Sequence, residues 1–176
     1  MNYPNAVIEE LMQDFRQTIG NDFVKYRNHV YRVFLNCILL DEAPENAEKY
    51  AIAAVFHDIG IWTDHSIDYL RPSIIEMRHY LTARGKAGLA DEISSMIYWH
   101  HKVSRYRGKF ELSTEVFRRA DWADITFGVI AFGLDSRKLL HNRKMLPNNG
   151  FHIFLAKKLV TNFFKNPLKP LPMFTK

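Results

Sequence analysis

Apolar side chains recur every three or four positions along almost the whole chain, which is the spacing of one face of an α-helix. In one segment the apolar stripe consists of Val30, Val33, Phe34, Cys37 and Ile38. No stretch alternates apolar and polar residues over enough positions to predict a β-strand. The pattern predicts helices over about 4–19, 22–40, 43–58, 71–84, 88–100, 112–132, 136–144 and 149–165. We therefore predict an all-α protein.

Residues that begin or end helices support these boundaries. Asn21 or Asp22 is suited to cap the second helix, and Pro72 suits the first turn of the fourth. Gly60 follows the end of the third apolar stripe, and glycine commonly lies just past the last turn of a helix. We therefore expect the third helix to end at Gly60.

The chain has the size and composition of one globular domain. It holds 176 residues, of which 47% are hydrophobic and 14% aromatic, so it can bury a sizeable core. The sequence contains no repeats, low-complexity segments or Gly/Ser-rich linkers. We expect a single domain over 1–176, with a core over about 20–130 and C-terminal helices and a basic tail over 131–176. The prolines of residues 165–176 predict an extended arm over the surface, at the interface of a homo-oligomer if one forms.

No segment has the composition of a membrane anchor or a secretory signal. The longest apolar runs are well short of the ~20 residues that span a bilayer. The N-terminal segment is acidic and helical in pattern, whereas a signal peptide needs a basic stretch followed by an apolar core. We expect a cytoplasmic protein without a membrane partner. Cys37 is the only cysteine and lies on an apolar stripe, so it is interpreted as a small core residue.

His57 and Asp58 are the most informative polar residues, because they follow the apolar run 51–56. A run of this kind is buried in a folded protein, and buried polar groups without partners cost on the order of a few kcal/mol each. A divalent transition metal accepts both an imidazole nitrogen and a carboxylate oxygen. A buried histidine that hydrogen-bonds its neighbour would also satisfy the dipeptide. The pair by itself leaves both interpretations open.

His29 and Asp121 lie in two further segments with helical apolar spacing. His29 borders the apolar stripe of the second predicted helix. Asp121 follows Ala120 and lies at the edge of the apolar face of the sixth. Asp124 lies three residues further on, on a similar helical face, and is the rival of Asp121. The resulting order of polar residues is His, then His-Asp, then Asp.

With this order, the chain resembles the HD-domain metal-dependent phosphohydrolase superfamily. The family's His-Asp typically follows an Ala-rich helix in a phrase like AALLHDIG, and its last aspartate lies in a phrase like ADxxD; this chain reads AAVFHDIG and ADWAD. The resemblance covers roughly residues 20–130 and implies an HD-domain-like helical bundle. It implies that His29, His57, Asp58 and Asp121 bind a divalent transition metal, namely manganese, iron, nickel, cobalt or zinc. Asp121 is preferred because it follows Arg-Arg-Ala, whereas Asp124 is expected to pair with a nearby base.

His100 and His101 end an apolar segment and enter a basic loop. Dinuclear members of the superfamily carry a His-His pair here that helps to hold a second metal, and a histidine before a proline between the two motifs. This chain has Arg71 before Pro72 instead, so the resemblance implies one tightly bound metal, with Arg71 binding phosphate. The alternative is that one histidine of the pair packs in the core and the other faces solvent. The candidate catalytic residues are Asp58, Arg71, His100 and His101.

The net charge of +5 suggests an anionic partner. Many basic residues lie next to the candidate site in the sequence, namely Lys25, Arg27, Arg32, Lys102, Arg105, Arg107, Arg118 and Arg119. This distribution favours a phosphorylated small-molecule substrate. Nucleic acid is a weaker candidate, because no helix carries an uninterrupted basic stripe.

The function that the resemblance implies is hydrolysis of a phosphorylated small molecule, such as a nucleotide or phosphoester, by attack of metal-bound water. Some nucleotidase members have a glutamate three residues after the His-Asp, where this chain has Ile61. The missing acid keeps an alternative open, which is a catalytically silent metal-binding or signalling HD module.

Overall fold

The computed structural model describes residues 3–64 and 68–165, and these residues form helices and no strand. The α-helices are α1 (Ala6–Asp14), α2 (Arg16–Ile19), α3 (Phe23–Leu40), α4 (Ala47–Phe56), α5 (Gly60–Thr63), α6 (Leu70–Ala83), α7 (Ala90–Trp99), α8 (Glu111–Ile125), α9 (Ser136–Met145) and α10 (Phe151–Lys165). Short 3₁₀ turns occur at η1 (Gly20–Asp22), η2 (Pro44–Asn46) and η3 (Ala87–Leu89). The prediction of an all-α protein is confirmed.

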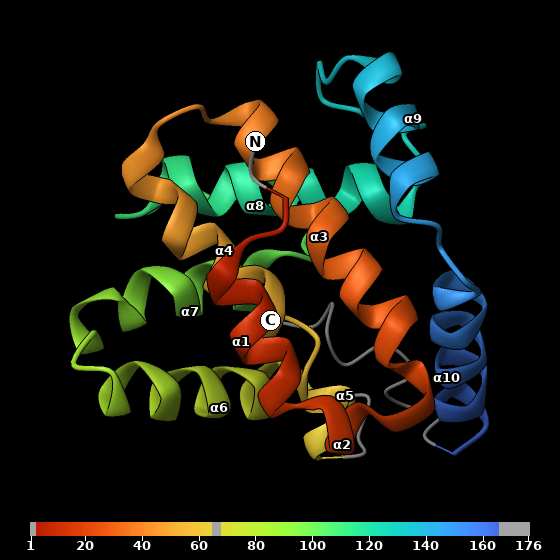
Figure 1. Cartoon of the computed structure of the whole chain (residues 1–176), viewed down its shortest axis with the longest axis horizontal. Helices are drawn as coiled ribbons and strands as arrows, with labels where there is room; N and C mark the ends of the chain where they lie inside the picture. Colours follow the sequence, from red (N-terminus) through yellow and green to blue (C-terminus); the bar gives the residue numbers. More distant parts are fainter. Residues whose placement is uncertain (1–2, 65–67, 166–176) are drawn as a thin grey trace.

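The central helix of the bundle is α3, which packs against α8 and α4 (Figure 1). The pair α6 and α7 packs against α4, and α7 also packs against α8. In Figure 1, α9 and α10 lie along one edge of the molecule. Because α3 is surrounded, it buries polar as well as apolar side chains, among them Asn28, His29, Arg32 and Asn36. The polar groups therefore meet inside the bundle, where each needs a partner.

The first predicted helix is divided into two. It begins at Ala6, where the Asn5 side chain caps it by accepting a hydrogen bond from the Ile8 amide at 3.1 Å. Phe15 then leaves helical geometry, with φ −91° and ψ 3°, and separates α1 from α2. Both helices bury apolar residues in the main core, so the apolar spacing predicts the burial but not the break.

Gly60 does not end the third helix as expected. The helix α4 ends at Phe56, a turn formed by residues 57–59 follows, and Gly60 begins α5. The residue has to be glycine because another part of the backbone lies very close. A Cβ atom at this position would lie 2.4 Å from the carbonyl oxygen of Tyr69 and 3.0 Å from the amide nitrogen of Ser73. Gly60 therefore brings the start of α6 against the His57-Asp58 turn.

The helix α8 ends at Ile125, seven residues before the predicted end at 132. Its end has the hydrogen bonds of a Schellman motif: the Gly128 amide donates to Ala123 O at 2.8 Å and the Phe127 amide to Asp124 O at 3.1 Å. Phe127 takes the left-handed conformation, with φ 55°, which is unfavourable for a bulky residue. Its ring stacks on His152 from α10 at 4.1 Å between centroids. The end of α8, which the apolar spacing did not predict, thus coincides with a tertiary contact between Phe127 and α10.

None of the helices in the described ranges has the length and apolar character that a membrane span requires. An extended arm was predicted over 165–176, and of these residues 166–176 lie outside the described residues.

Candidate metal centre

Four side chains from three parts of the fold direct ligand atoms at one point in the core. His29 comes from α3, His57 and Asp58 from the turn after α4, and Asp121 from α8. The Nε2 atoms of His29 and His57 lie 3.0 Å apart. The Nε2 atom of His29 lies 3.8 Å from Asp58 Oδ2 and 3.6 Å from Asp121 Oδ1. The Nε2 atom of His57 lies 3.5 Å and 3.9 Å from the same two oxygens.

These separations are those of atoms that coordinate one ion. Ligands at ~2.0–2.1 Å from a transition metal lie about 3 Å apart at right angles and about 3.4 Å apart in a tetrahedron. All four side chains are buried, so these polar groups lie close together without bulk water around them. The sequence-based candidates His29, His57, Asp58 and Asp121 are therefore brought together.

Hydrogen bonds at the far side of each imidazole direct its Nε2 atom at the cluster. His57 Nδ1 lies 2.7 Å from the carbonyl oxygen of Ala54, and a carbonyl can only accept, so Nδ1 carries a proton. His29 Nδ1 lies 2.7 Å from Asp124 Oδ2 and donates in the same way. The two Nε2 atoms then face each other at 3.0 Å, a separation that suits two ligands of one cation.

Three buried atoms around the same point have no hydrogen-bond partner among the described residues. They are Asp58 Oδ1, Asp121 Oδ2 and His100 Nε2. Buried polar atoms are almost always paired, because an unpaired one costs on the order of 1–3 kcal/mol. All three atoms can donate an electron pair to a metal, so the unpaired atoms and the ligand distances both fit a cation at this point.

The buried groups differ in their charge. Burial lowers the pKa of His57 to about 3, which keeps this imidazole neutral and able to bind a metal. Burial and the nearby carboxylates of Asp58 and Asp124 raise the pKa of Asp121 to about 6, although His100 and His29 oppose the shift. Burial also opposes ionisation of Asp58, but its interactions with His57 and His100 outweigh burial and lower its pKa below the usual value. The centre thus combines the neutral imidazole of His57 with the ionised carboxylate of Asp58.

Asp124, the rival of Asp121 in the sequence, faces away from this point and pairs with a base. Its carboxylate accepts hydrogen bonds from Arg32 Nε at 2.7 Å and Nη2 at 2.9 Å, besides the one from His29. Burial would raise its pKa, but the bonds from His29 and Arg32 more than compensate and lower it. Asp124 therefore orients the His29 ring, as carboxylates behind metal-binding histidines commonly do.

A second group of potential ligands shares Asp58 with the first. Ligand atoms of Asp58, His100 and His101 all lie within 4.8 Å of one another. His100 Nδ1 donates to Ile97 O at 2.6 Å, and its Nε2 lies 3.5 Å from Asp58 Oδ1. The Tyr69 hydroxyl contacts Nε2 of His101. Sequence reasoning did not select Tyr69 for this site, because it lies eleven residues beyond Asp58 and its approach depends on the close packing at Gly60.

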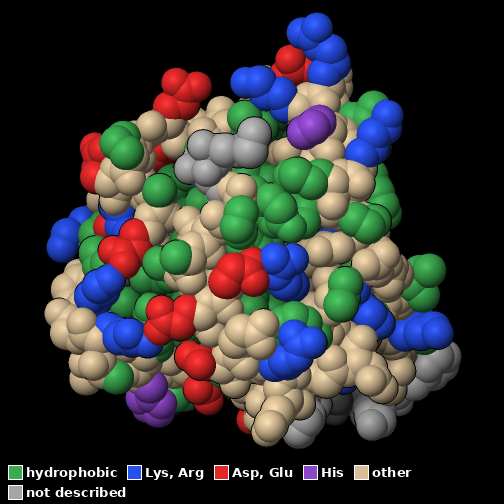
Figure 2. Space-filling model, viewed as in Figure 1, with side chains coloured by type: hydrophobic (Ala, Val, Ile, Leu, Met, Phe, Trp, Pro, Cys, Tyr) green, Lys and Arg blue, Asp and Glu red, His purple; other side chains and the backbone are tan. Residues whose placement is uncertain are grey.

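The basic residues that neighbour the site in the sequence are largely used elsewhere. Arg118 is paired with Glu115 in a buried ion pair, and Arg105 pairs with Glu111 near the surface. Arg71 is exposed on the first turn of α6, and no hydrogen bond or ion pair joins it to another described residue. On the face shown in Figure 2, acidic and basic side chains are interspersed over the main body, and Lys and Arg side chains gather over α9. On this face, the charge excess of the sequence therefore forms no continuous basic surface over the main body.

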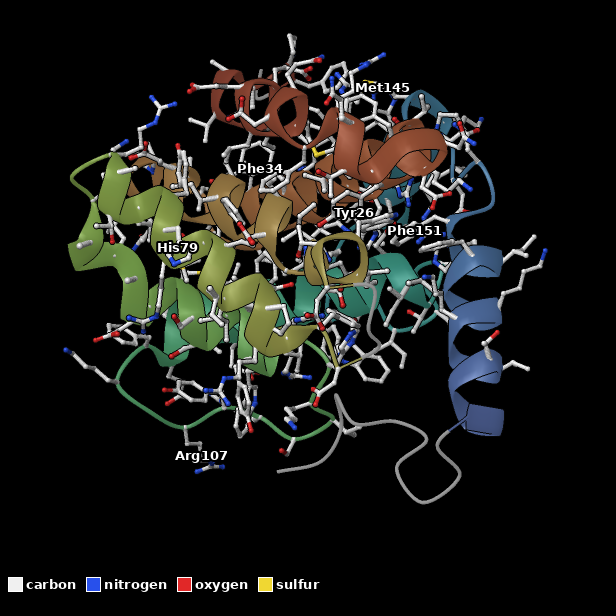
Figure 3. All side chains as sticks on the ribbon, turned by 90° about the horizontal axis from the view of Figure 1, so that it is seen from below. Tyr26, Phe34, His79, Arg107, Met145 and Phe151 are labelled. Carbon is white, nitrogen blue, oxygen red and sulfur yellow. The ribbon has the colours of Figure 1, made fainter. Side chains whose placement is uncertain are left out.

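Aromatic rings enclose the histidine side of the centre. Phe151, at the start of α10, stacks on the His29 ring at 4.3 Å between centroids. Tyr26 lies beside Phe151 in the interior (Figure 3), and its hydroxyl donates to Val55 O at 2.7 Å. Apolar surroundings strengthen electrostatic interactions with a bound ion. The C-terminal helix thus contributes to the environment of His29, although it lies far away in the sequence.

Comparison with known proteins agrees with this geometry. The family model described as HD domain matches residues 26–126, which is more than half of the chain and contains the four clustered side chains. Comparison with curated proteins gave no match, and comparison with solved structures gave none either. The match to the family model and the helical bundle that brings His29, His57, Asp58 and Asp121 together show that this chain belongs to the HD-domain family, a superfamily of metal-dependent phosphohydrolases.

Proposed function

We propose that the protein is a metal-dependent phosphohydrolase that acts on a phosphorylated small molecule, such as a nucleotide or another phosphoester. The observation that supports this proposal most strongly is the buried pair of imidazole Nε2 atoms at 3.0 Å, both of which lie within 4 Å of the carboxylates of Asp58 and Asp121. The set His29, His57, Asp58 and Asp121 would hold one divalent transition metal.

The protein residues have separate roles in this proposal. The two histidines and two carboxylates would hold a divalent ion, which would supply Lewis-acid chemistry by lowering the pKa of coordinated water and polarising a phosphoryl oxygen. His29 and His57 present their Nε2 atoms because Asp124 and the Ala54 carbonyl hold the opposite sides of the rings. Asp58 and Asp121 supply the negative charge that balances the ion. His100 and His101 lie beside Asp58, where they can contact the substrate or a second ion.

The proposed class of substrate is supported by the net charge of the chain and by its family. The chain carries five more basic than acidic residues, and the HD-domain superfamily consists mostly of phosphohydrolases. Arg71 lies two residues beyond Tyr69 on the surface of α6, where its guanidinium is not engaged by another described residue. Guanidinium groups bind phosphate through paired hydrogen bonds. Arg71 would therefore meet the part of the phosphate group that extends out of the buried centre.

Metal analysis combined with an activity panel tests this function. The purified full chain is analysed for manganese, iron, nickel, cobalt and zinc, and is then assayed with each ion against nucleotides and generic phosphomonoesters and diesters. We expect stoichiometric metal and release of phosphate or hydrolysed nucleotide. His29→Ala should lose both. The matched control is His79→Ala, since His79 is an exposed histidine on α6 (Figure 3) outside both ligand groups and should retain both.

A catalytically silent metal-binding or signalling module is the second candidate, and one observation favours it. The position three residues after Asp58 is occupied by Ile61, which is buried and cannot transfer a proton. A silent module predicts that the wild-type chain binds metal stoichiometrically and hydrolyses none of the substrates with any of the ions. Absence of metal from the wild-type chain would contradict both candidates.

A further inference from the structure

Tyr69 is a buried tyrosine whose side chain reaches the ligand cluster from the start of α6. Only 3% of its surface is exposed, and its hydroxyl contacts Nε2 of His101. His101 is the member of the two ligand groups that is partly exposed, whereas the others are buried. The Tyr69–His101 contact is therefore on the side of the cluster that lies nearest to solvent.

The position of Tyr69 is imposed by the backbone next to the His57-Asp58 turn. The Gly60 amide donates to the Ser73 hydroxyl at 2.9 Å, and the Ser73 amide donates to Tyr69 O at 2.9 Å. The same Tyr69 carbonyl oxygen would lie 2.4 Å from a Cβ atom at Gly60. This close packing ties Tyr69 to Asp58 through rigid backbone, which limits the freedom of the phenol ring.

Few hydrogen-bond donors remain for an anion at the centre. The Nδ1 atoms of His29, His57 and His100 already face acceptors, namely Asp124 Oδ2, Ala54 O and Ile97 O. Each nitrogen of the Arg32 guanidinium donates one hydrogen bond, to Asp124 or to the Leu146 carbonyl. Arg118 is held by Glu115. The basic side chains closest to the cluster are thus committed within the protein.

The Tyr69 hydroxyl lies between two groups of the cluster, because it is within hydrogen-bonding reach of the Asp58 carboxylate as well as of His101. A phenol has a single proton and can pass this hydrogen bond to a phosphate oxygen that approaches the same point. Unlike a lysine or arginine, it adds no positive charge that would compete with a cation for the same carboxylates.

We propose that Tyr69 is a substrate-binding residue of the centre, whose hydroxyl donates a hydrogen bond to an oxygen of a phosphate group bound between His101 and the carboxylates. The proposal rests on the proposed function, because it requires a metal and a phosphate group in this site. The resemblance to the dinuclear members of the superfamily directs attention to Arg71. The structure instead places Tyr69, two residues earlier, inside the cluster, and Arg71 on the surface.

Binding of inorganic phosphate to the metal-loaded full chain tests the role of Tyr69. Calorimetry compares the wild type with Tyr69→Phe, which removes one oxygen atom and retains the ring. Loss of a hydrogen bond to a charged group should weaken phosphate binding roughly ten- to hundredfold, while the metal content stays unchanged. The matched control is Tyr50→Phe, which removes a buried hydroxyl that donates to Asp41 away from the centre, and which should alter phosphate affinity by less than about twofold.

A second measurement tests the contact without metal or phosphate. In the metal-free protein, the Nε2 resonance of His101, observed by long-range ¹H–¹⁵N correlation, should shift in Tyr69→Phe and not in Tyr50→Phe. An unchanged His101 resonance would show that the hydroxyl is not placed against the ring and would overturn the inference. Equal phosphate affinity of metal-loaded wild type and Tyr69→Phe would also overturn it and would leave the proposed function intact. A wild-type chain that binds no metal would overturn both.

Discussion

Asp121 and Asp124 lie three residues apart on α8, and the structure predicts opposite consequences when each is changed to asparagine. Asp124 is a buried ion-pair partner that accepts three hydrogen bonds, two from Arg32 and one from His29. Asp121 has one oxygen near the two Nε2 atoms and another without a hydrogen-bond partner. Asparagine is nearly isosteric with aspartate, so both changes alter charge without creating a cavity.

The expected magnitudes follow from burial and charge. Breaking a buried ion pair by neutralising one partner costs about 3–5 kcal/mol, out of a total stability of about 5–15 kcal/mol. For a chain of this length, Asp124→Asn should therefore lower Tm by roughly 6–20 °C. The pKa of Asp121 rises from 3.8 to about 6 in the folded protein. This shift of 6 − 3.8 = 2.2 means that ionised Asp121 costs roughly 3 kcal/mol at neutral pH. Without metal, Asp121→Asn should therefore be as stable as the wild type or more stable.

The sign of the pH dependence provides a further test. Because the pKa of Asp121 is raised on folding, the folded state binds more protons than the unfolded state between pH 3.8 and about 6. The contribution of Asp121 to stability is complete below pH 3.8 and is lost as the pH rises through about 6. Metal-free wild type should thus lose stability from this group on going from pH 5 to pH 8, and Asp121→Asn should lack that component.

Metal binding is expected to reverse the order of stability of the two variants. Asp124→Asn keeps all four ligands but loses the group that orients His29, so its metal affinity should fall about 10–100-fold. Asp121→Asn loses a ligand and should retain little metal. The assay is urea denaturation in chelator and in excess metal, together with metal analysis after dialysis. Full metal content in Asp121→Asn with loss in Asp124→Asn would refute the assignment of the fourth ligand, and equal destabilisation of both metal-free variants would refute the charge argument.

Three further predictions concern neighbouring features. Gly60→Ala should destabilise the protein by roughly 1–3 kcal/mol in urea denaturation, because its Cβ atom would lie 2.4 Å from the carbonyl oxygen of Tyr69; unchanged stability would show that this contact is looser. Arg71→Ala should raise KM or lower kcat for a phosphorylated substrate roughly tenfold or more with unchanged metal content and Tm, since the side chain is exposed; unaltered kinetics would exclude a phosphate contact. Metal affinity should fall as the pH drops below about 6, where protons compete for Asp121; an affinity independent of pH between 5 and 7 would contradict the involvement of this carboxylate.

The apolar spacing of the sequence determined where helices form, because burial of one face is a local property of the chain. The long stripe over α3 is an example, since the observed helix Phe23–Leu40 differs from the predicted range 22–40 by one residue at its start. Helix ends were less predictable. The end of α8 at Ile125 depends on Phe127, which adopts a left-handed conformation while packed against His152 of another helix. Such a contact cannot be read from local spacing.

Much of the candidate site could also be selected from residue types. His57 and Asp58 follow an apolar run that has to be buried, so the sequence alone indicates that both side chains need polar or metal partners. It does not indicate which partners these are. The tertiary structure decided which atoms meet. Asp121 and Asp124 have similar places on α8, and the resemblance to the family preferred Asp121; the structure shows which base pairs with Asp124, because Arg32 of α3 lies opposite it.

Tyr69 and Arg71 show the same difference between what the sequence indicates and what the tertiary structure decides. Both precede or open α6, and a sequence pattern favours the arginine because guanidinium binds phosphate. The backbone contact between Gly60 and Tyr69 instead directs the phenol into the cluster and leaves Arg71 on the surface. Residue types and periodicity are local and determined the helices and the candidate ligands. The partners of each buried group depend on contacts between distant segments, and only the packed structure decided those.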